Sequence, residues 1–334
     1  MKKYNVAVVG ATGLVGKEIL DTLEDVEFPI NEIRLLASKK SEGQVLQFQG
    51  KASRIQELTE QSFKNIDFAL FSAGSSISEK FAPIAAKEGC TVIDNTSFFR
   101  MHDNIPLIVP EVNGHVLNGK NNIIANPNCS TAQLVMALKP IHDEVGIERI
   151  VISTYQAVSG AGKDALLELE NHSRLSLNGQ QPEPKEFTYP IAFNIIPQID
   201  IFLDNGYTKE EMKMIEETKK ILDPSIEVTA TAVRVPVFVS HSESVNIKTK
   251  KEISVEKVKD ILAKFEGVSV LDDPSNTTYP TPREISGKND VFVGRIRKDN
   301  SQKNGLDLWV VADNLRKGAA LNAVQIAQYI IAKS

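Results

Sequence analysis

The chain has 334 residues, of which 42% are hydrophobic and 24% are charged, so it is expected to be globular and to form more than one domain. Its net charge of −5 lacks the basic footprint of a nucleic-acid-binding domain. No window approaches the roughly 18 consecutive apolar residues that a membrane span requires. Only two cysteines occur, Cys90 and Cys129, which excludes a disulfide framework and favours a reducing, cytoplasmic location.

Short apolar strands alternate with helices in the first part of the chain. Strands are expected at residues 5–9, 33–37, 68–72 and 91–94, and helices at 13–23 and 81–87. Strands that alternate with helices predict a parallel sheet covered on both faces. This part of the sequence therefore indicates an α/β domain.

The pattern changes after Cys129. A helix over 131–143 is followed by segments rich in β-branched residues at 149–158, 228–239, 245–250, 291–297 and 306–311. These segments predict a mixed or antiparallel sheet. Proline-rich stretches at 179–190 and 272–282 are expected to be loops, and apolar residues at helical spacing predict a final helix over 318–331.

A glycine-rich turn, GATGLVG at residues 10–16, joins the first expected strand to the first expected helix. Glycines allow a tight turn and a close backbone approach to a pyrophosphate, which the free N–H groups of a helix N-terminus bind. The spacing is G-x-x-G-x-x-G rather than the commoner G-x-G-x-x-G. Its place between strand and helix favours dinucleotide binding over a purely structural turn.

The residues after the second expected strand bear on the choice of cofactor. An NAD site usually places Asp or Glu there to bind the ribose hydroxyls. This chain instead has Ser38, Lys39, Lys40 and Ser41, whose hydroxyls and cations suit a 2′-phosphate. We therefore predict NADP; the alternative is a solvated, charged loop that also contains Glu42.

Cys129 lies immediately before an apolar-periodic helix, in the sequence NPNCST at residues 126–131. A thiol at a helix N-terminus is exposed to the positive end of the helix dipole, which favours the thiolate. Cys90, at the start of a strand, is expected to be a small buried hydrophobe. We predict that Cys129 is a nucleophile, and an ordinary capping loop is the alternative.

A catalytic cysteine needs a partner that moves protons. His241 is the candidate among five histidines, because alternation places it on the same strand face as Val237 and Val239. A buried structural histidine is the alternative. Arg234 precedes it by seven residues, which puts the two on opposite faces of a regular strand, but Pro236 between them makes an irregular strand plausible.

Taken together, these motifs resemble the aspartate-semialdehyde dehydrogenase family over essentially the whole chain. The segments that carry the resemblance are 10–16, 94–100, 128–131, 156–162, 234–241 and 313–318. The resemblance implies a Rossmann-type NADP-binding domain of α/β class at residues 1–128 plus 314–334. A catalytic and dimerisation domain of α+β class, with a mixed sheet and helices, would be inserted at 129–313. It also implies a homodimer, with a tetramer as the alternative.

The resemblance implies a reaction as well. L-Aspartyl 4-phosphate and NADPH would give L-aspartate 4-semialdehyde, phosphate and NADP, a step in lysine, threonine, methionine and diaminopimelate biosynthesis. Cys129 would attack the acyl phosphate, and the resulting thioester would accept a hydride before the hemithioacetal collapses. His241 would move the proton, Gln156 would orient the intermediate, and Arg234 would bind the substrate carboxylate.

Further contacts also follow from the resemblance. Substrate and phosphate contacts are expected from Asn95, Arg100, Glu217 and Lys220, with Glu217 pairing with the substrate ammonium group. A shift of one residue within EETKK at 216–220 would select Glu216 and Lys219 instead. Cofactor contacts are expected from Gly10, Thr12, Gly13, Leu14, Val15, Ser38, Lys39, Lys40, Ser41, Ser72, Ser159, Gly160 and Asn314. No metal site is predicted.

Three alternative functions fit parts of the same pattern. An N-acetyl-glutamyl-phosphate reductase shares the chemistry with a longer, acetylated substrate. A glyceraldehyde-phosphate-type dehydrogenase fits less well, because its substrate leaves the carboxylate-binding arginine without a purpose. A non-catalytic NADP-binding paralogue would be expected to lack an unusually reactive thiol at Cys129.

Overall fold

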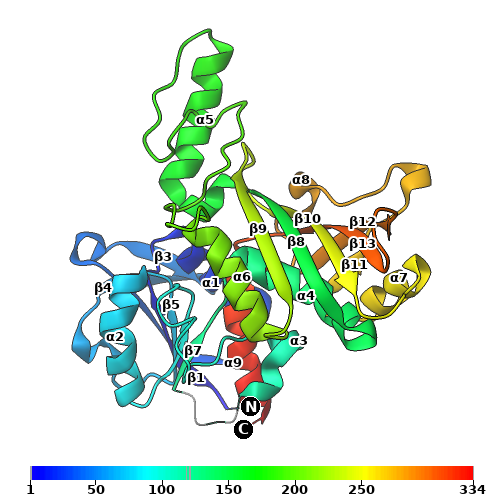
Figure 1. The fold of residues 1–334 in the computed structure, drawn as a ribbon. Helices are drawn as coiled ribbons and strands as arrows, with labels where there is room; N and C mark the ends of the chain where they lie inside the picture. The colour runs from blue at the N-terminus through cyan, green and yellow to red at the C-terminus, as the bar shows by residue number, and fades with distance from the viewer. Residues whose placement is uncertain (1, 118, 120–121, 334) are drawn as a thin grey trace. The chain divides into compact units, whose positions relative to one another are not determined.

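The computed structural model describes residues 2–117, 119 and 122–333 (Figure 1). Contacts between residues divide the chain into two compact units: Met1–Asn128 with Ala319–Ser334, and Cys129–Gly318. Among the described residues, no helix is both long and apolar enough to cross a membrane.

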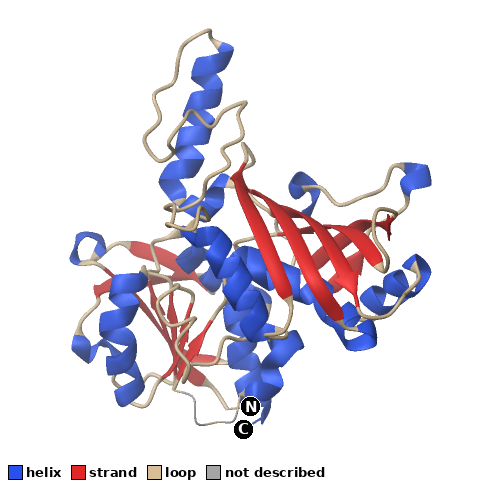
Figure 2. Cartoon of the chain, viewed as in Figure 1, coloured by secondary structure: helices blue, strands red, loops and turns tan. Residues whose placement is uncertain are grey.

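The first unit is built on a parallel sheet. Seven strands within the described residues have the order β3-β4-β2-β1-β5-β6-β7. Strands are drawn in red in Figure 2. They are β1 (Tyr4–Val9), β2 (Ile30–Ala37), β3 (Val45–Phe48), β4 (Lys51–Glu57), β5 (Phe68–Phe71), β6 (Thr91–Asp94) and β7 (Ile123–Ala125). Only β3 and β4 pair antiparallel. Val6, Val8 and Val92 in the central strands are fully buried, as expected when helices cover both faces, and the α/β class is confirmed.

The strand order of the first unit switches direction between β1 and β5, and helices connect the strands. The helices are α1 (Leu14–Asp25), α2 (Ser75–Lys87), α3 (Pro110–Asn113) and α9 (Leu321–Lys333). α1 packs with α9, whereas α2 packs on β5, β6 and β7. The chain runs outward from β1 to β2 on one side and from β5 to β6 on the other. Open α/β sheets bind ligands at such a switch point, beyond the carboxyl ends of the strands.

The second unit contains a mixed sheet. Its six strands, counted in the described part of the chain, have the order β11-β12-β13-β10-β8-β9. They are β8 (Ile147–Gln156), β9 (Glu227–Arg234), β10 (His241–Thr249), β11 (Val268–Val270), β12 (Val291–Asp299) and β13 (Gly305–Ala312). β8 pairs parallel with β9, and β11 with β12; the other pairs are antiparallel. The mixed sheet predicted for this part is confirmed.

Helix α4 (Cys129–Val145) covers one face of the second sheet. It packs on β8, β10, β12 and β13, and most of its residues are buried, including Leu134, Leu138 and Ile141. Helix α6 (Lys209–Ile221) packs on β9 and α4, and α7 (Val255–Ala263) packs on β11 and β12. The remaining helices are α5 (Lys163–Leu177), which projects away from the sheet (Figure 1), and the short α8 (Pro282–Ile285).

The expected strand over 228–239 is interrupted, which corrects the prediction for His241. β9 ends at Arg234 and β10 begins at His241, so the two residues lie on different strands. Pro236 in the connection lacks the N–H group that a continuing ladder needs. Ser240 has a φ of 78°, a left-handed conformation that reverses the chain just before His241.

The return from the second unit to the first comes slightly later than the expected residue 314. The second unit extends to Gly318, and a π-helical turn, η6 (Arg316–Ala320), leads into α9. The expected helix over 318–331 therefore begins as a regular α-helix only at Leu321. π-Helical turns are rare and often lie at functional sites.

Candidate functional site

A cavity of about 500 Å³ lies at the switch point of the first unit. The predicted cofactor residues that line it are Gly10, Thr12, Gly13, Ser38, Lys39 and Ser72. Leu14 and Val15 form the first turn of α1, and Lys40 and Ser41 continue from Lys39 into a short 3-10 helix. The turns after β1, β2 and β5 thus meet at one cavity.

The glycine turn fits a pyrophosphate. Gly10 has a φ of +89°, and a Cβ atom there would lie 2.9 Å from the backbone carbon of Ser72, so only glycine fits. Gly13 is the N-cap of α1 and makes no side-chain capping bond. The first N–H groups of α1 therefore have no side-chain cap and suit an anion.

The edge of this cavity fits the 2′-phosphate of NADP. Ser38 and Lys39 line the cavity and are solvent-exposed. A hydroxyl and an ammonium group at this position suit a phosphate, which an acidic side chain in the same place would repel. Glu57, at the end of β4, also lines the cavity, and its carboxylate partly offsets the positive charge of Lys39.

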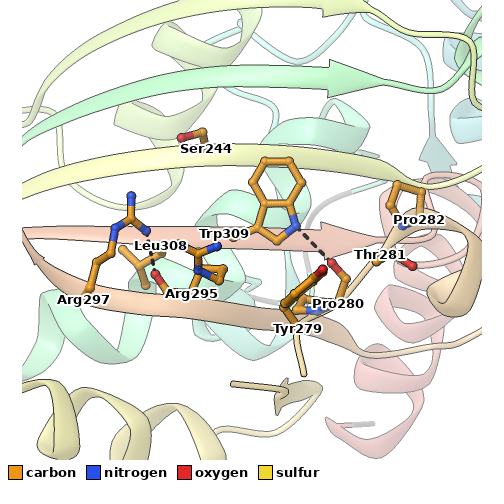
Figure 3. Close-up of a pocket in the computed structure, with 9 residues that line it drawn as sticks. All are labelled: Ser244, Tyr279, Pro280, Thr281, Pro282, Arg295, Arg297, Leu308 and Trp309. Atoms are coloured by element: carbon orange, nitrogen blue, oxygen red, sulfur yellow. Dashed lines mark hydrogen bonds between the residues drawn. The ribbon is translucent and has the colours of Figure 1, made fainter. Parts of the chain in front are cut away.

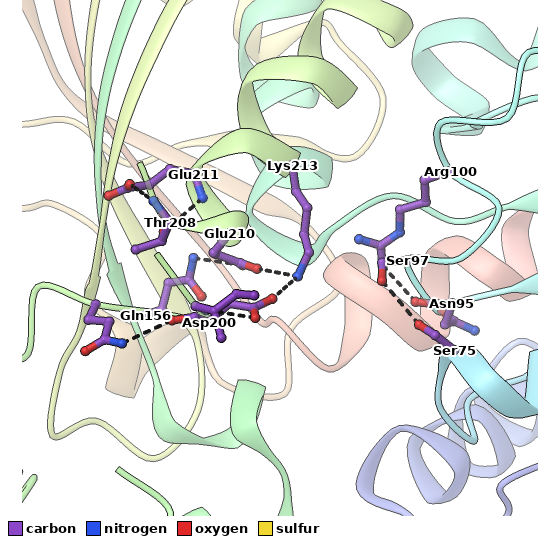
Figure 4. Close-up of polar contacts among 12 residues, drawn as sticks. Ser75, Asn95, Ser97, Arg100, Gln156, Asp200, Thr208, Glu210, Glu211 and Lys213 are labelled. Carbon is purple, nitrogen blue, oxygen red and sulfur yellow. Dashed lines mark hydrogen bonds and ion pairs between the residues drawn. The ribbon is translucent and has the colours of Figure 1, made fainter. Parts of the chain in front are cut away.

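The loop after β6 holds Arg100 in a fixed orientation (Figure 4). Arg100 is buried; its Nε donates to the Asn126 carbonyl at 2.9 Å and its Nη2 donates to the Asn95 carbonyl at 2.7 Å. The Asn95 amide nitrogen donates to the Phe71 carbonyl at 3.0 Å. Arg100 and Asn95, both predicted to bind phosphate, therefore lie together.

The side chain of buried Asp94 also holds this loop in place. Its carboxylate accepts hydrogen bonds from the Ser78 hydroxyl at 2.8 Å, the Thr96 N–H at 3.0 Å and the Thr96 hydroxyl at 2.8 Å. Burial raises the pKa of Asp94, against the lowering effect of these donors and of Arg100. The loop is thus tied to β6 and α2 by side-chain bonds.

In the second unit, Cys129 is the first residue of α4 and is partly exposed. Gly318 packs directly against it, because a Cβ atom at position 318 would lie 2.7 Å from the Cys129 Cβ. Cys90, by contrast, is buried, and burial raises its pKa to about 11. Cys129 is therefore the thiol with both access and a helix N-terminus.

Gln156, Arg234 and His241 lie at the same edge of the second sheet. Gln156 ends β8, Arg234 ends β9 beside it, and His241 begins β10, which is antiparallel to β8 on its other side. All three side chains are buried. The break between β9 and β10 therefore brings Arg234 and His241 to one edge, where a single regular strand would have separated them.

Arg234 is held by the turn that follows β8. Its Nη1 donates to the Ala157 carbonyl at 2.7 Å. Burial lowers the pKa of Arg234, while the negative charges of Glu210 and Cys129 raise it. Arg234 is thus electrostatically linked to Cys129 at the start of α4.

The imidazole of His241 is held as a neutral ring with a defined tautomer. Its Nδ1 accepts a hydrogen bond from the Ala157 N–H at 3.0 Å, so the ring proton resides on Nε2. Nε2 has no hydrogen-bond partner among the described residues. Burial, together with Arg234, lowers the pKa of His241 well below its ordinary value. The ring therefore offers an uncharged N–H donor.

Ser159 and Gly160 lie in the loop that follows β8, and Asn314 lies in the segment that follows β13. The Asn314 Oδ1 accepts from the Ser159 hydroxyl at 3.0 Å and from the Ser240 N–H at 2.9 Å. A Cβ atom at Gly160 would lie 3.0 Å from the Arg234 Nη1 and 3.3 Å from His241. Asn314 thus fixes both the loop and the left-handed residue that precedes His241.

Two residues near Gln156 were missed by the sequence prediction: Glu210 and Lys213 (Figure 4). Gln156 Nε2 donates to the Glu210 carboxylate at 3.3 Å. Lys213 contacts Glu210 at 3.2 Å and Asp200 at 2.9 Å, and although burial lowers its pKa, these two carboxylates raise it above its ordinary value. The signal was available, since Glu210 and Lys213 have the same spacing as Glu217 and Lys220.

Glu217 and Lys220 lie farther along the same helix. The Ala232 N–H donates to Glu211 at 2.9 Å, which sets the start of α6 beside the end of β9. Seven residues of α-helix span about 10 Å, so Glu217 lies two turns from Glu210 in the direction away from the Arg234 end of β9. Glu217 is fully buried, and the alternative residues Glu216 and Lys219 belong to the same later turns.

Comparisons with known proteins agree with this geometry. A family model described as "Semialdehyde dehydrogenase, NAD binding domain" matches residues 5–120, and "Semialdehyde dehydrogenase, dimerisation domain" matches residues 138–317. The chain is 54% identical to an aspartate-semialdehyde dehydrogenase of Aquifex aeolicus, over 98% of each protein. The structure is similar to that of aspartate semialdehyde dehydrogenase II of Vibrio cholerae complexed with ASA, with a TM-score of 0.97, 52% identity and 99% of each chain covered.

A more distant solved structure is relevant to the cofactor. Aspartate semialdehyde dehydrogenase of Candida albicans with NADP is 26% identical, with a TM-score of 0.77 and 99% of each chain covered. The matches span nearly the full length of both the chain and its relatives. A nucleotide cavity, a cysteine at a helix start and a sheet edge with arginine and histidine agree with them. The chain belongs to the aspartate-semialdehyde dehydrogenase family.

Proposed function

We propose that this chain is an NADP-dependent aspartate-semialdehyde dehydrogenase. It would reduce L-aspartyl 4-phosphate to L-aspartate 4-semialdehyde, with release of phosphate, through a thioester on Cys129. The observation that carries the proposal is the arrangement in the second unit. A partly exposed thiol begins α4, and it is electrostatically linked to Arg234 at the sheet edge that also holds His241.

Cys129 is proposed as the nucleophile. Its thiolate would attack the acyl carbon, and the C–O bond to phosphate would break, which leaves a thioester and free phosphate. The helix dipole at the start of α4 and the cationic Arg234 both favour the thiolate. The sulfur is also a good leaving group, so the same residue serves when the hemithioacetal collapses to the aldehyde.

His241 is proposed to act on the substrate oxygen. Its Nε2–H can donate to the oxygen that gains negative charge on tetrahedral intermediates, and the buried neutral ring need not reorganise to do so. The full proton transfer to and from the hemithioacetal oxygen that we predict for His241 would pass through its imidazolium form, in which both ring nitrogens carry a proton. Gln156, one strand away, would orient the acyl group from the same edge.

Charged residues near this edge would bind the amino-acid part of the substrate. Arg234 presents a guanidinium that suits the α-carboxylate. For the ammonium group we now favour Glu210 over Glu217, because Glu210 contacts Gln156 and raises the pKa of Arg234. Lys213 replaces Lys220 as a proposed cation for phosphate, and Arg100 and Asn95 stay the proposed phosphate-binding residues of the first unit.

The first unit is proposed to bind NADP in the cavity between the turns after β1, β2 and β5. Gly10 and Gly13 would admit the pyrophosphate, and Ser38 and Lys39 would bind the 2′-phosphate. Ser159, Gly160 and Asn314 of the second unit are further proposed contacts. The reduced cofactor, when bound, supplies the hydride for the thioester carbon.

We also propose a cytoplasmic homodimer, with a tetramer as the alternative. The family model that matches residues 138–317 is described as a dimerisation domain. The segment around α5 exposes many large apolar side chains, including Leu167, Leu177, Tyr189, Phe193, Ile195, Ile201 and Phe202. A monomeric protein rarely exposes so many large apolar side chains in one segment, and a second copy of the chain would cover them.

The sheet face opposite α4 is a second surface that suits a partner copy. The rings of Tyr155 and Trp309 lie against each other there, with centroids 5.5 Å apart and planes tilted by 47°, and Tyr155 is 36% exposed. A cavity of about 430 Å³ beside Trp309 is lined by Tyr279, Arg295 and Ser244, among others (Figure 3). Aromatic residues and arginine are enriched in protein interfaces.

The direct test measures phosphate-dependent reduction of NADP by L-aspartate semialdehyde. We expect activity that requires phosphate and that disappears in Cys129→Ala, with unchanged NADP binding as the control for folding. An inactive parent protein that binds NADP normally would reject the proposal and favour the acetylated substrate or a non-catalytic paralogue. Full activity in Cys129→Ala would reject the thioester.

A further inference from the structure

Glu243 is a fully buried carboxyl group for which the proposed reaction has no role. It lies on β10 two residues after His241, so the two side chains are on the same face of the sheet, towards α4. Its partners on the neighbouring strands are Thr154 of β8 and Val310 of β13. Neither carries a charge, and Glu243 is 0% exposed.

Gln133 faces Glu243 from helix α4. It lies four residues after Cys129, one helical turn away on the same side of the helix, and it is also fully buried. Its amide is close enough to lower the pKa of Glu243, although the geometry falls short of a hydrogen bond. Both oxygens of Glu243, both polar atoms of Gln133 and the Thr154 hydroxyl have no hydrogen-bond partner among the described residues.

Electrostatics favour a proton on Glu243. Burial raises its pKa well above the ordinary value, and Gln133 is the one side chain that lowers it. The ionisable groups nearest along its own and its facing elements are His241 on β10 and Cys129 on α4. More distant along the elements that pack here are Lys248 on β10, Glu148, Arg149 and Tyr155 on β8, Asp307 on β13, and Lys139, His142, Asp143 and Glu144 on α4.

The chemistry of the two side chains is complementary only when Glu243 is neutral. A protonated carboxyl has one O–H donor and one carbonyl acceptor, and a primary amide has an N–H donor and a carbonyl acceptor. The two can exchange a pair of hydrogen bonds and leave few polar atoms unsatisfied. An ionised carboxylate could accept from Gln133 but would leave the amide oxygen unpaired in an apolar site.

We propose that Glu243 and Gln133 form a neutral carboxyl–carboxamide pair that positions Cys129, at the start of α4, relative to His241 on β10. The pair joins α4 to β10. On α4 it lies one helical turn after Cys129, and on β10 it lies two residues after His241. Glu243 is thus a positioning residue that does not touch the substrate. This inference rests on the proposed function, because it concerns the geometry of the proposed nucleophile.

Substitutions that keep or remove the pair test this role. In Glu243→Gln two amides can still exchange two hydrogen bonds, so we expect kcat within about twofold of the parent. Glu243→Leu and Gln133→Leu remove the pair, and displacement of the thiol should lower kcat by about 10- to 100-fold. KM should change little, because the substrate-binding groups remain in place. The double leucine variant should be no slower than either single variant.

Two readouts do not depend on the enzyme's activity. Infrared spectroscopy of the parent at neutral pH should show the carbonyl stretch of a protonated carboxyl, which Glu243→Gln removes. Alkylation of Cys129 by iodoacetamide should slow in Glu243→Leu and not in Glu243→Gln. Cys90 interferes little, because burial raises its pKa to about 11.

Several outcomes would overturn the inference. The first is the absence of the infrared band in the parent; the second is equal loss of kcat in Glu243→Gln and Glu243→Leu. Additive losses in the two leucine variants would mean that Glu243 and Gln133 act independently. If a leucine variant does not fold, the infrared band and the Glu243→Gln comparison still decide. A parent with the band but without activity on the semialdehyde would reject the proposed function alone.

Discussion

Glu210 and Glu217 provide a sharp comparison, because they lie on one face of α6 and are both buried. The change to glutamine removes the negative charge from either residue and preserves its shape. If Glu210 pairs with the substrate ammonium group, Glu210→Gln should lower kcat/KM for the semialdehyde far more than Glu217→Gln. The second variant is the matched control for loss of a buried carboxylate from the same helix.

The structure sets the expected magnitude. The Glu210 side chain is 8% exposed, and it contacts Gln156 at 3.3 Å and Lys213 at 3.2 Å, so it is fixed and poorly solvated. A hydrogen bond to a charged group contributes about 1.5–3 kcal/mol. At about 1.4 kcal/mol per factor of ten, this corresponds to a loss of roughly 10- to 150-fold in kcat/KM. Glu217→Gln should change kcat/KM by less than about threefold, because it lies about 10 Å farther along the helix.

The assay is phosphate-dependent NADP reduction over a range of semialdehyde concentrations, with thermal unfolding measured on each variant. The unfolding control matters because both carboxylates are buried and either change can destabilise the fold. A larger loss of kcat/KM in Glu217→Gln, at equal thermal stability, would refute the assignment and restore Glu217. Equal losses would mean that neither residue contacts the ammonium group alone.

Three further changes test other parts of the structure. Lys39→Glu should lower kcat/KM for NADP by about 10-fold or more and leave NAD little affected, since it puts a repulsive charge at the cavity edge; an unchanged ratio of the two cofactors would contradict this. Gly160→Ala places a Cβ atom 3.0 Å from Arg234 and 3.3 Å from His241, so kcat should fall by about 10-fold; an unchanged kcat would contradict this. Glu243 keeps in the native state a proton that the unfolded chain releases above the ordinary glutamate pKa, so stability declines as pH rises, by up to about 1.4 kcal/mol per unit. Glu243→Gln lacks this decline, and its advantage in unfolding free energy should grow between pH 5 and 8; a constant difference would show that Glu243 is ionised in the native state.

Local patterns in the sequence predicted much of the first unit. A glycine turn between a strand and a helix is a local feature, and the structure places Gly10 where a side chain would collide with Ser72. The thiol at a helix start was equally local, since α4 begins at Cys129 itself. The hairpin of β3 and β4 was missed, because its residues are largely exposed and lack a strong apolar alternation.

The candidate site in the second unit could be predicted only in part. Arg234 and His241 were identified, but their geometry depends on a chain reversal at Ser240. Pro236 indicated an irregular strand in the sequence but not this reversal. The choice between Glu210 and Glu217 depends on how α6 lies along β9, and spacing along one helix cannot reveal this. Similar charged pairs recur two helical turns apart, so the way in which α6 packs along β9 has to select between them.

In the second unit, the proposed catalytic residues are held by two different kinds of packing, one rigid and one that tolerates small shifts. Gln156, Arg234 and His241 are attached to the ends of three hydrogen-bonded strands, which fixes their spacing by the sheet ladder. Cys129 is attached instead to the end of a helix, whose position on the sheet depends on side-chain packing and not on backbone bonds. Helix–sheet packing tolerates small shifts that a strand ladder does not, and shifts of this size are enough to misplace a nucleophile. A buried polar pair between α4 and β10 is therefore most useful directly below the thiol, which is where Gln133 and Glu243 lie.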